Sequence, residues 1–519
     1  MATIGIYQSS VFFIMYFIFV LFIISFLMNF RNILKQFKKI KRKTWVYLFI
    51  VFLMGLLLRL FVFPHVHLMY IDEPWYMEMA KNMNQKLQPV ICEYPDYNVE
   101  NCQMPIKAPG WPFLISIVFL IFGVNNYHAL YFSSIIGSLS IILIFLLTYI
   151  IFRNQKTALW SSFFLALTPI HVMWSNSAET NNASVFFVLL TMVFFLIFIQ
   201  CKKKTILVLT ILSLLLTILT RFENIVLIGI FVLGYILFSK SLPKSSLGQI
   251  FGAFYPLIVV IMLIIIIVFQ YHFVKVFRNT ILTIDFYYLN LFEFLKVSSF
   301  NYVYLLLAAA CLFLRNEKDK TKIVYLFTSF LIFFTLYLPI FSEDRMALMP
   351  SVFIIILSAY FLGKLCNSFV KHAVFTILLI SIFSCLFGLN LNSTYDHISS
   401  KYKEHILETQ IVMELTNIIP ENCYLIAEWP TVFTSISNIK GVRTSNALNN
   451  PEIVEGIIKK TGCVYHFYDG YCTDRTISRP QGSRERCQDM LRMFEYYREK
   501  EFERGNVKYY LFRVNGLRY

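Results

Sequence analysis

Long apolar runs dominate this 519-residue chain, and they constrain its fold more than any other feature. A helix of about 20 apolar residues crosses the hydrocarbon core of a bilayer. Charged residues make up only 15% of the chain, against about 25% in ordinary soluble domains. Twelve runs, several of them shorter than a full crossing, are candidate spans: 4–30, 45–63, 127–152, 157–175, 181–200, 205–220, 224–239, 248–270, 301–314, 323–341, 346–362 and 373–391. The sequence therefore predicts a polytopic α-helical membrane protein with about 12 transmembrane helices.

The net charge of +16 is better explained by membrane orientation than by nucleic-acid binding. Much of the excess lies in short loops between apolar runs, where Lys and Arg keep a loop in the cytosol. No basic region precedes the first run, which is long enough to span, so we expect a membrane helix there rather than a cleavable signal. A basic cluster in 31–44 follows this run, which places the N-terminus outside.

The remaining loops alternate in charge as this orientation requires. The loops expected inside are all basic: 31–44, 153–156, 202–204, 240–244, 315–322 and 364–371. The segments expected outside are 64–126, which is rich in Asp and Glu, then 176–180, 221–224, 271–300, 342–345 and everything after about 392. The inside–outside order of the loops is consistent only if Pro109–Gly123 does not cross the membrane. The length of this segment, about fourteen residues, suits a re-entrant or interfacial helix.

Cysteines agree with an outer, oxidising location for the same segments. Cys92 and Cys102 share the first outer loop and are the obvious disulfide pair. Four more lie in the C-terminal region, at Cys423, Cys463, Cys472 and Cys487, where three pairings stay open; no C-x-x-C spacing indicates zinc.

From about residue 399 the composition becomes that of a soluble domain. Helices are expected at Glu404–Asn417, Pro451–Lys460 and Arg484–Arg504, and strands at Cys423–Ala427, Cys463–Tyr468 and Val507–Val514. Helices that alternate with short apolar strands predict a small α/β domain with a partly parallel sheet. The expected units are 1–44, an extra helix and a basic cytosolic loop; 45–392, a membrane module with 64–126 as its first outer loop; and 393–519, a soluble extracytoplasmic α/β domain.

Five charged motifs fall in the segments expected outside. They are Asp72 with Glu73 after the second run, Lys107 in a Pro-rich turn, Glu179 before the fifth run, Arg221 with Glu223, and Arg345. Four have an ordinary structural explanation: Asp72 suits a helix N-cap, Lys107 a snorkelling side chain, the Glu179 loop a simple connector, and Arg221 with Glu223 an ion pair. All five motifs are expected on the same side of the membrane, and charges at shallow membrane depth often mark substrate paths. We therefore expect the five motifs to form one site.

The order of these motifs resembles the GT-C class of membrane glycosyltransferases, and most of all the group of dolichyl-phosphate-mannose protein mannosyltransferases and aminoarabinose transferases. The likeness runs through about 45–365: an Asp-Glu pair (Asp72, Glu73), a Lys-Pro segment opening a helix that ends Phe122-Gly123, an acidic outer loop (Glu179), a Thr-Arg-x-Glu turn (Arg221, Glu223) and a late Arg345. The chain departs from the pattern at Ala108, at Glu179 and at Phe222, and its first helix lies outside the usual core.

The resemblance implies an inverting transfer of a sugar from a polyprenyl- or dolichyl-phosphate donor to a protein, lipid or glycan acceptor. Asp72 would be the general base, and Glu73 would orient the acceptor or the sugar. Lys107, Arg221 and Arg345 would bind the donor phosphate. Glu179, Glu223 and His272 would contact sugar or acceptor. The aromatic segment 271–300 is either a lid or an interfacial helix.

We expect no resident cofactor, although Asp72 and Glu179 could serve a divalent metal such as Mg or Mn. The alternatives are a multi-pass transporter, an enzyme acting on asparagine like an oligosaccharyltransferase, and a non-catalytic subunit of the same fold. A transporter would carry charges in mid-membrane and paired repeats, which the sequence does not display. Apart from substrates, the lipid bilayer is the expected partner, and nucleic acid is not.

Overall fold

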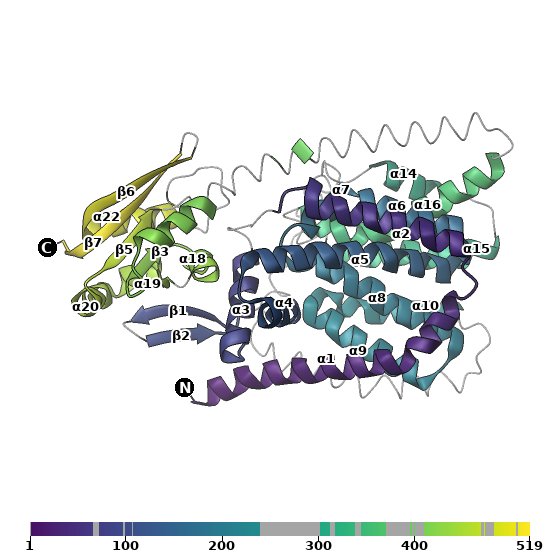
Figure 1. Ribbon diagram of the computed structural model, residues 1–519, viewed down its shortest axis with the longest axis horizontal. Coiled ribbons are helices and arrows are strands. Elements are labelled where there is room, and N and C mark those ends of the chain that lie inside the picture. Colours follow the sequence, from purple (N-terminus) through teal and green to yellow (C-terminus); the bar gives the residue numbers. More distant parts are fainter. Residues whose placement is uncertain are drawn as a thin grey trace.

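The computed structural model describes residues 2–65, 72–96, 99–105, 107–238, 302–311, 317–337, 344–369, 395–396, 399, 409–437, 439–468, 472, 482–504 and 507–518. A bundle of roughly parallel and antiparallel helices forms one part, and a smaller α/β domain lies beyond one end of it (Figure 1). The expected spans near 248–270 and 373–391, His272 and the segment 271–300 lie outside the described residues.

Six described helices are long and apolar enough to cross a membrane: α1 (Ala2–Phe37), α2 (Arg42–Leu57) with its π-helical turn η1 (Leu58–Val62), α5 (Asn126–Phe152), α8 (Thr180–Cys201), α15 (Glu317–Tyr337) and α16 (Leu348–Phe369). Shorter apolar helices are α4 (Gly110–Phe122), α9 (Lys204–Thr220), η2 (Phe222–Val226) joined to α10 (Leu227–Phe238), and α14 (Tyr302–Cys311). The described spans follow the apolar runs of the sequence.

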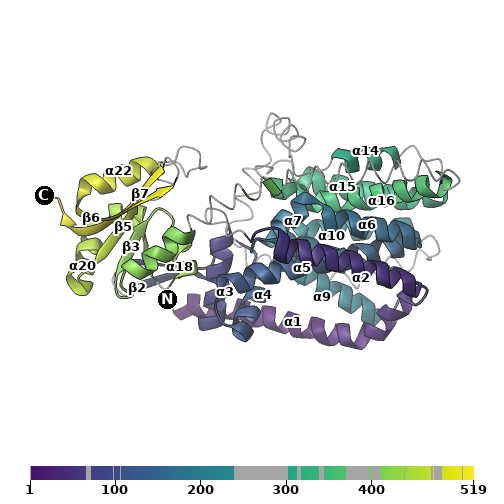
Figure 2. The ribbon, with the colours of Figure 1, turned by 45° about the horizontal axis from the view of Figure 1, so that its top comes forward.

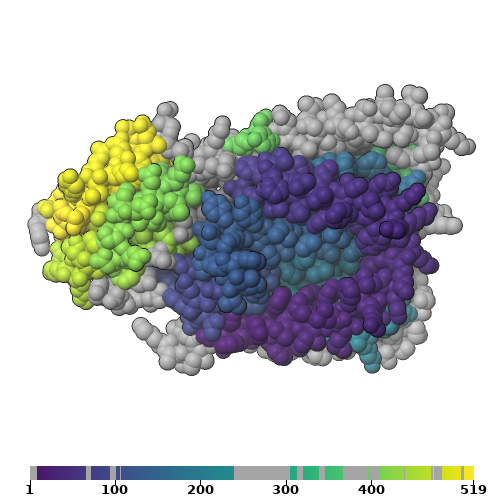
Figure 3. All heavy atoms as spheres, viewed as in Figure 1, coloured from purple at the N-terminus to yellow at the C-terminus, as the bar shows by residue number. Residues whose placement is uncertain are grey.

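The helices differ in how much of their apolar surface other helices cover. α5, α8 and α16 are mostly buried, whereas α1 and α2 leave large side chains such as Phe17 and Phe61 exposed. Figure 3 shows α1 and α2 on one outer face of the bundle. Exposed aromatic and aliphatic side chains are the expected surface of a helix that faces lipid.

A broken span is held together by a buried arginine. α6 (Gln155–Leu167) and α7 (Pro169–Ser175) meet at 58°, because Pro169 has no N–H to donate to the carbonyl of Leu165. The Arg59 guanidinium, which has no exposed surface, donates to the carbonyls of Leu165 (3.4 Å) and Ala166 (3.2 Å). It also contacts Nδ1 of His171 at 2.8 Å. Arg59 thus satisfies backbone groups that the break exposes.

The basic loops gather at one end of the bundle. Gln155 contacts the first basic loop through Thr44 (2.6 Å), and Lys203 donates to Asn32 (2.9 Å). At the same end Lys322 lies over the ring of Phe152. The N-terminus of α1 lies at the opposite end, near the α/β domain (Figure 1). The described loops therefore separate by charge as the sequence predicts.

The other end of the bundle carries α3 (Glu73–Lys86), α4 and a hairpin of β1 (Ile91–Asp96) and β2 (Val99–Gln103). The hairpin was not foreseen from the sequence. Cys92 and Cys102 face each other across it and form a disulfide, as expected. The thirteen-residue α4 is too short to span the bilayer squarely, and that Pro109–Gly123 does not cross stays a prediction.

The α/β domain is built on a sheet with the order β4-β3-β5-β7-β6. Its strands are β3 (Tyr424–Ala427), β4 (Lys440–Arg443), β5 (Val464–Tyr468), β6 (Phe494–Arg504) and β7 (Val507–Leu517). β4, β3 and β5 are parallel, and β7 and β6 are antiparallel neighbours, so the sheet is partly parallel as predicted. Helical residues 409–418 and α18 (Thr431–Ile436) pack on one face; α19 (Thr444–Asn449), α20 (Pro451–Thr461) and α22 (Ser483–Met493) pack on the other.

One predicted element of this domain is wrong in its second half. The expected helix Arg484–Arg504 ends as α22 at Met493, and the chain continues as β6. The charges suggested one long solvated helix, but Phe494 and Phe502 are buried and β6 pairs along its length with β7. Tertiary pairing therefore outweighs local helix propensity here. The open cysteine pairing is resolved as Cys423–Cys463 and Cys472–Cys487.

Candidate functional site

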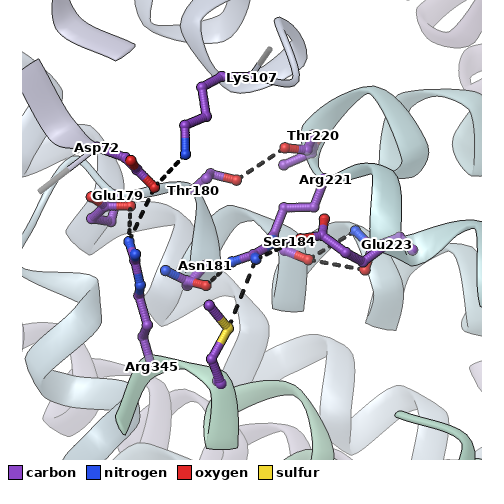
Figure 4. Close-up of polar contacts among 12 residues, drawn as sticks. Asp72, Lys107, Glu179, Thr180, Asn181, Ser184, Thr220, Arg221, Glu223 and Arg345 are labelled. Atoms are coloured by element: carbon purple, nitrogen blue, oxygen red, sulfur yellow. Dashed lines mark hydrogen bonds and ion pairs between the residues drawn. The ribbon is translucent and has the colours of Figure 1, made fainter. Parts of the chain in front are cut away.

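Asp72 lies just before α3 and faces two cations. Its Oδ2 atom is 2.8 Å from Nζ of Lys107 and 3.5 Å from Nη1 of Arg345 (Figure 4). Although Asp72 occupies the N-cap position, its side chain makes no capping hydrogen bond. The explanation of Asp72 as an ordinary helix cap is therefore wrong, and its carboxylate is directed into a charged cluster instead.

Lys107 reaches Asp72 from the turn before α4. That turn presses against the end of α9, because a Cβ atom at Gly110 would lie 2.5 Å from the carbonyl oxygen of Leu219. Only glycine fits such a close approach. The Lys107 ammonium also lies 5.6 Å from the centroid of the Trp75 ring, a cation–π contact. The Lys107 side chain is thus held between a carboxylate and an aromatic face.

Glu179 and Arg345 form the buried side of the cluster. Glu179, with no exposed surface, ends the loop before α8, and Arg345 lies in η4 (Asp344–Ala347), just before α16. Oε2 of Glu179 is 3.2 Å from Nη1 of Arg345, the same nitrogen that approaches Asp72. Among the described residues neither oxygen of Glu179 accepts a hydrogen bond of good geometry. Arg345 therefore lies between two carboxyl groups.

The loop that carries Glu179 is held by two residues of other motifs. Oε2 of Glu73 accepts a hydrogen bond from the backbone N–H of Ala178 at 3.2 Å, and the indole N–H of Trp111 donates to the carbonyl of Ala178 at 2.7 Å. Both side chains have no exposed surface. Oε2 of Glu73 therefore holds this loop, and the expected contact of Glu73 with acceptor or sugar stays a prediction.

Arg221 and Glu223 make a second charged pair beside the first cluster. Nη2 of Arg221 lies 2.9 Å from Glu223, and Nη1 donates to Asn181, two residues beyond Glu179 (Figure 4). The guanidinium also lies 5.6 Å from the ring centroid of Tyr337. The ion pair anticipated from the turn thus exists, and it borders the cluster around Asp72.

Burial and charge act in opposite directions on the two acids next to Arg345. Burial by itself would raise the pKa of Asp72, but Lys107 and Arg345 outweigh it and hold this pKa below its ordinary value. Burial raises the pKa of Glu179 to about 8; Arg345 opposes this rise and the nearby Asp72 adds to it. Near neutral pH, Asp72 is therefore the ionised acid and Glu179 the largely protonated one.

The structure brings the five predicted motifs to one end of the bundle. It also adds Trp75, Trp111 and Tyr76, which the sequence argument did not select. Tyr76 follows Asp72 by four residues on α3, is buried, and has a pKa raised by burial and by the Asp72 and Glu179 charges. Tyr76 could have been selected from the sequence, because its spacing of four residues from Asp72 puts both on one side of a helix.

The side chains that the structure describes at the site do not by themselves make a divalent-metal centre. A hard cation of this kind is held by several converging oxygen ligands. Within the described ranges, no three His, Cys, Asp or Glu side chains gather closely enough to hold one. The positive charge between Asp72 and Glu179 is the guanidinium of Arg345.

One part of the sequence matches a known protein family. Residues 106–272 match the profile of the family described as dolichyl-phosphate-mannose-protein mannosyltransferase. No curated protein sequence matches the chain significantly.

Solved structures resemble about nine tenths of the chain. The archaeal oligosaccharyltransferase AglB from Archaeoglobus fulgidus, in complex with an inhibitory peptide and a dolichol-phosphate, is 11% identical, with a TM-score of 0.54 over 91% of this chain and 74% of that one. The same organism's enzyme with Zn and sulfate is 13% identical, with a TM-score of 0.57 over 88% and 72%. ArnT from Cupriavidus metallidurans, bound to undecaprenyl phosphate, is 15% identical, with a TM-score of 0.55 over 91% and 98%. The expected GT-C-like membrane fold with a C-terminal α/β domain is confirmed.

Proposed function

We propose, from a GT-C fold whose residues 106–272 match the mannosyltransferase family, that this chain is a glycosyltransferase using a lipid-phosphate sugar donor. It transfers the sugar to an acceptor hydroxyl with inversion at the anomeric carbon. The observation that carries the proposal is the carboxylate of Asp72, paired at 2.8 Å with Lys107 and at 3.5 Å with Arg345.

Asp72, Lys107 and Arg345 have complementary roles in such a reaction. The acceptor oxygen bonds to the anomeric carbon, its proton passes to Asp72, and the bond from that carbon to the phosphate oxygen breaks. The electron pair leaves with the polyprenyl phosphate, and Lys107 and Arg345 stabilise the charge that develops there. A carboxylate paired with two cations is a weak base, however. Donor phosphate would draw Lys107 and Arg345 toward itself and so make Asp72 more basic as the substrates assemble.

The neighbouring acids and the second cation fit roles around this centre. Glu179 holds Arg345 from its buried side at 3.2 Å, and Arg221 lies beside Asn181, at the margin of the cluster. AglB and ArnT have each been solved with a lipid phosphate, which supports a polyprenyl- or dolichyl-phosphate donor here. No step of the proposed transfer uses a metal.

The proposed site belongs at the outer face of the membrane. The contacts among the loops 31–44, 153–156 and 202–204 place the described basic loops at one end. Such loops stay in the cytosol, so the opposite end, with Asp72 and the α/β domain, is extracytoplasmic. The disulfides Cys92–Cys102 and Cys423–Cys463 support this side, because disulfides form in oxidising compartments.

The test compares Asp72→Asn with a surface control, Asp489→Asn, in cells that lack the native protein. Asp489 is an exposed acid of the α/β domain. Mass spectrometry of lipid-phosphate sugars and surface glycans should show the donor accumulating with Asp72→Asn, as in the null cells, and returning to normal with Asp489→Asn. The accumulated donor would also identify the sugar. If membrane-inserted Asp72→Asn restores normal levels, the catalytic proposal fails and a transporter or non-catalytic subunit takes its place.

A further inference from the structure

The helix α3 separates the charged cluster from the α/β domain. Asp72, at its start, and Tyr76 face the cluster. Trp75, Glu78 and Lys81 follow one another at intervals of three residues, so they share a side of the helix. In both ribbon views α18 is the helix of the α/β domain nearest α3 (Figures 1 and 2). α3 is thus in contact with both parts of the molecule.

The segment 429–437 of the α/β domain binds this second side of α3. Nζ of Lys81 donates to the carbonyls of Thr434 and Ser437, at 3.0 Å each. The Thr434 hydroxyl donates to the buried carboxyl of Glu78 at 2.7 Å. These are specific polar contacts at a protected interface, and they fix the domain in one position along α3.

An aromatic pair carries this contact to the charged cluster. The rings of Trp429 and Trp75 lie 5.6 Å apart at an interplanar angle of 39°. Trp75 in turn lies beneath the ammonium of Lys107, which pairs with Asp72. Only two side chains, Trp75 and Lys107, therefore separate Trp429 from Asp72.

We infer that Trp429 is a positioning residue of the proposed active site: through Trp75 it holds the Lys107 ammonium against Asp72. The inference rests on the proposed function for its catalytic meaning, but the positioning itself is a structural claim. Lys107 is partly exposed, and a flexible ammonium in water samples many rotamers. The Trp75 ring, which packs against the indole of Trp429, restricts these rotamers. The α/β domain is accordingly part of the site and not only a cover.

The first test needs no turnover. Full-length protein in detergent is treated with an amine-reactive reagent, and modification of Lys107 is followed by peptide mass spectrometry. Trp429→Ala should increase the labelling rate of Lys107 at least about threefold, and Trp429→Phe should stay near the native rate. Tyr497→Ala, which removes an exposed aromatic ring from β6 of the same domain, should change nothing. Unchanged Lys107 labelling in folded Trp429→Ala would overturn the inference.

Folding is checked by the thermal unfolding midpoint and by the intact Cys423–Cys463 disulfide. Where Trp429→Ala does not fold, Trp429→Leu replaces it with the same expectation, because leucine keeps apolar bulk against the domain and removes the indole ring.

The second test is the pH profile of kcat/KM for sugar transfer. The charged and titratable groups that face Asp72 are Lys107, Arg345, Glu179, Arg221 and Tyr76. Lys107 and Arg345 lower the pKa of Asp72, so a displaced Lys107 raises it. A base works above its pKa, and the acid limb of the profile should therefore move to higher pH in Trp429→Ala.

A purely structural role for Trp429 would lower the rate at every pH without moving this limb, and that result would count against the inference. If the native protein transfers no sugar from any lipid-phosphate donor, the proposed function fails. The labelling experiment still decides the positioning of Lys107 in that case, so the two failures can be told apart.

Discussion

Nη1 of Arg345 lies 3.2 Å from Oε2 of Glu179, a carboxyl group with no exposed surface. A charged group buried this deeply is costly unless it is paired. The contact links η4, late in the chain, to the loop before α8. Since the same nitrogen approaches Asp72, Arg345 connects the proposed base to the buried acid.

Replacing Arg345 should therefore affect the reaction more than the fold. In Arg345→Gln, Glu179 can stay protonated and neutral, so the protein should still insert and fold. We expect kcat/KM to fall by about 100-fold or more, because a cation that meets the developing phosphate charge is removed. Transfer assays with purified protein check this, and Arg492→Gln, at an exposed ion pair, is the control. A loss of less than about threefold would argue against phosphate binding by Arg345.

Ionisation of Glu179 should weaken donor binding at alkaline pH and so produce the alkaline limb of the pH–activity profile. Burial raises its pKa to about 8, so the carboxyl is mainly protonated at pH 7 and gains a negative charge as the pH passes through 8. A negative charge there repels donor phosphate, and the KM for the donor should rise above about pH 8. In Glu179→Gln this rise should disappear. A KM that increases equally in both proteins between pH 7 and 9 would assign the limb to another group.

Glu78 should make the contact between α3 and the α/β domain sensitive to pH. Burial is the largest cause of its pKa of about 7, although hydrogen bonds from Cys92 and Thr434 oppose the rise. Its pKa is raised in the folded state, so the stability it contributes is present in full below about pH 4.5 and declines as the pH rises to about 7. The loss amounts to on the order of 3 kcal/mol.

Thermal unfolding of the detergent-solubilised protein between pH 4.5 and 8 measures this dependence. Glu78→Gln keeps an oxygen that can accept from the Cys92 N–H and has no proton to lose. Its midpoint should therefore decline less over this range and exceed that of the native protein above pH 7. A decline as steep as that of the native protein would show that other groups cause it.

Arg59 should be essential for the folded bundle rather than for chemistry. Arg59→Met removes the guanidinium donor from the carbonyl of Ala166 and from the ring of His171, and it leaves the carbonyl of Leu165 only the 3.4 Å bond from the Thr168 N–H, at about 1–3 kcal/mol for each buried group left unsatisfied. The unfolding midpoint should fall by several degrees, and less protein should reach the membrane. Lys203→Met, at the exposed contact with Asn32, is the matched control. Equal stability of the two variants would show that water or lipid replaces the guanidinium at little cost.

Much of the site could be predicted because charged residues in an apolar chain are conspicuous. Asp72, Lys107, Glu179, Arg221 and Arg345 stood out at the ends of apolar runs, and loop charge alone put all of them on one side. The pairing of Cys92 with Cys102 followed from their shared loop. Trp75, Trp111 and Trp429 were missed, since an aromatic residue in a chain with 54 Phe and 31 Tyr carries no local signal.

The apolar runs and loop charges of the sequence by themselves determined the described spans and the shared end of the bundle at which the acids and cations lie. Only the tertiary structure decided that Asp72 shares its oxygen with Lys107 and Arg345, that Glu73 holds the Glu179 loop, and that 494–504 is a strand. Those outcomes depend on contacts between residues up to 273 positions apart. The free energy of such contacts comes from packing and burial among residues that are distant in sequence, so a short stretch of sequence cannot reveal it.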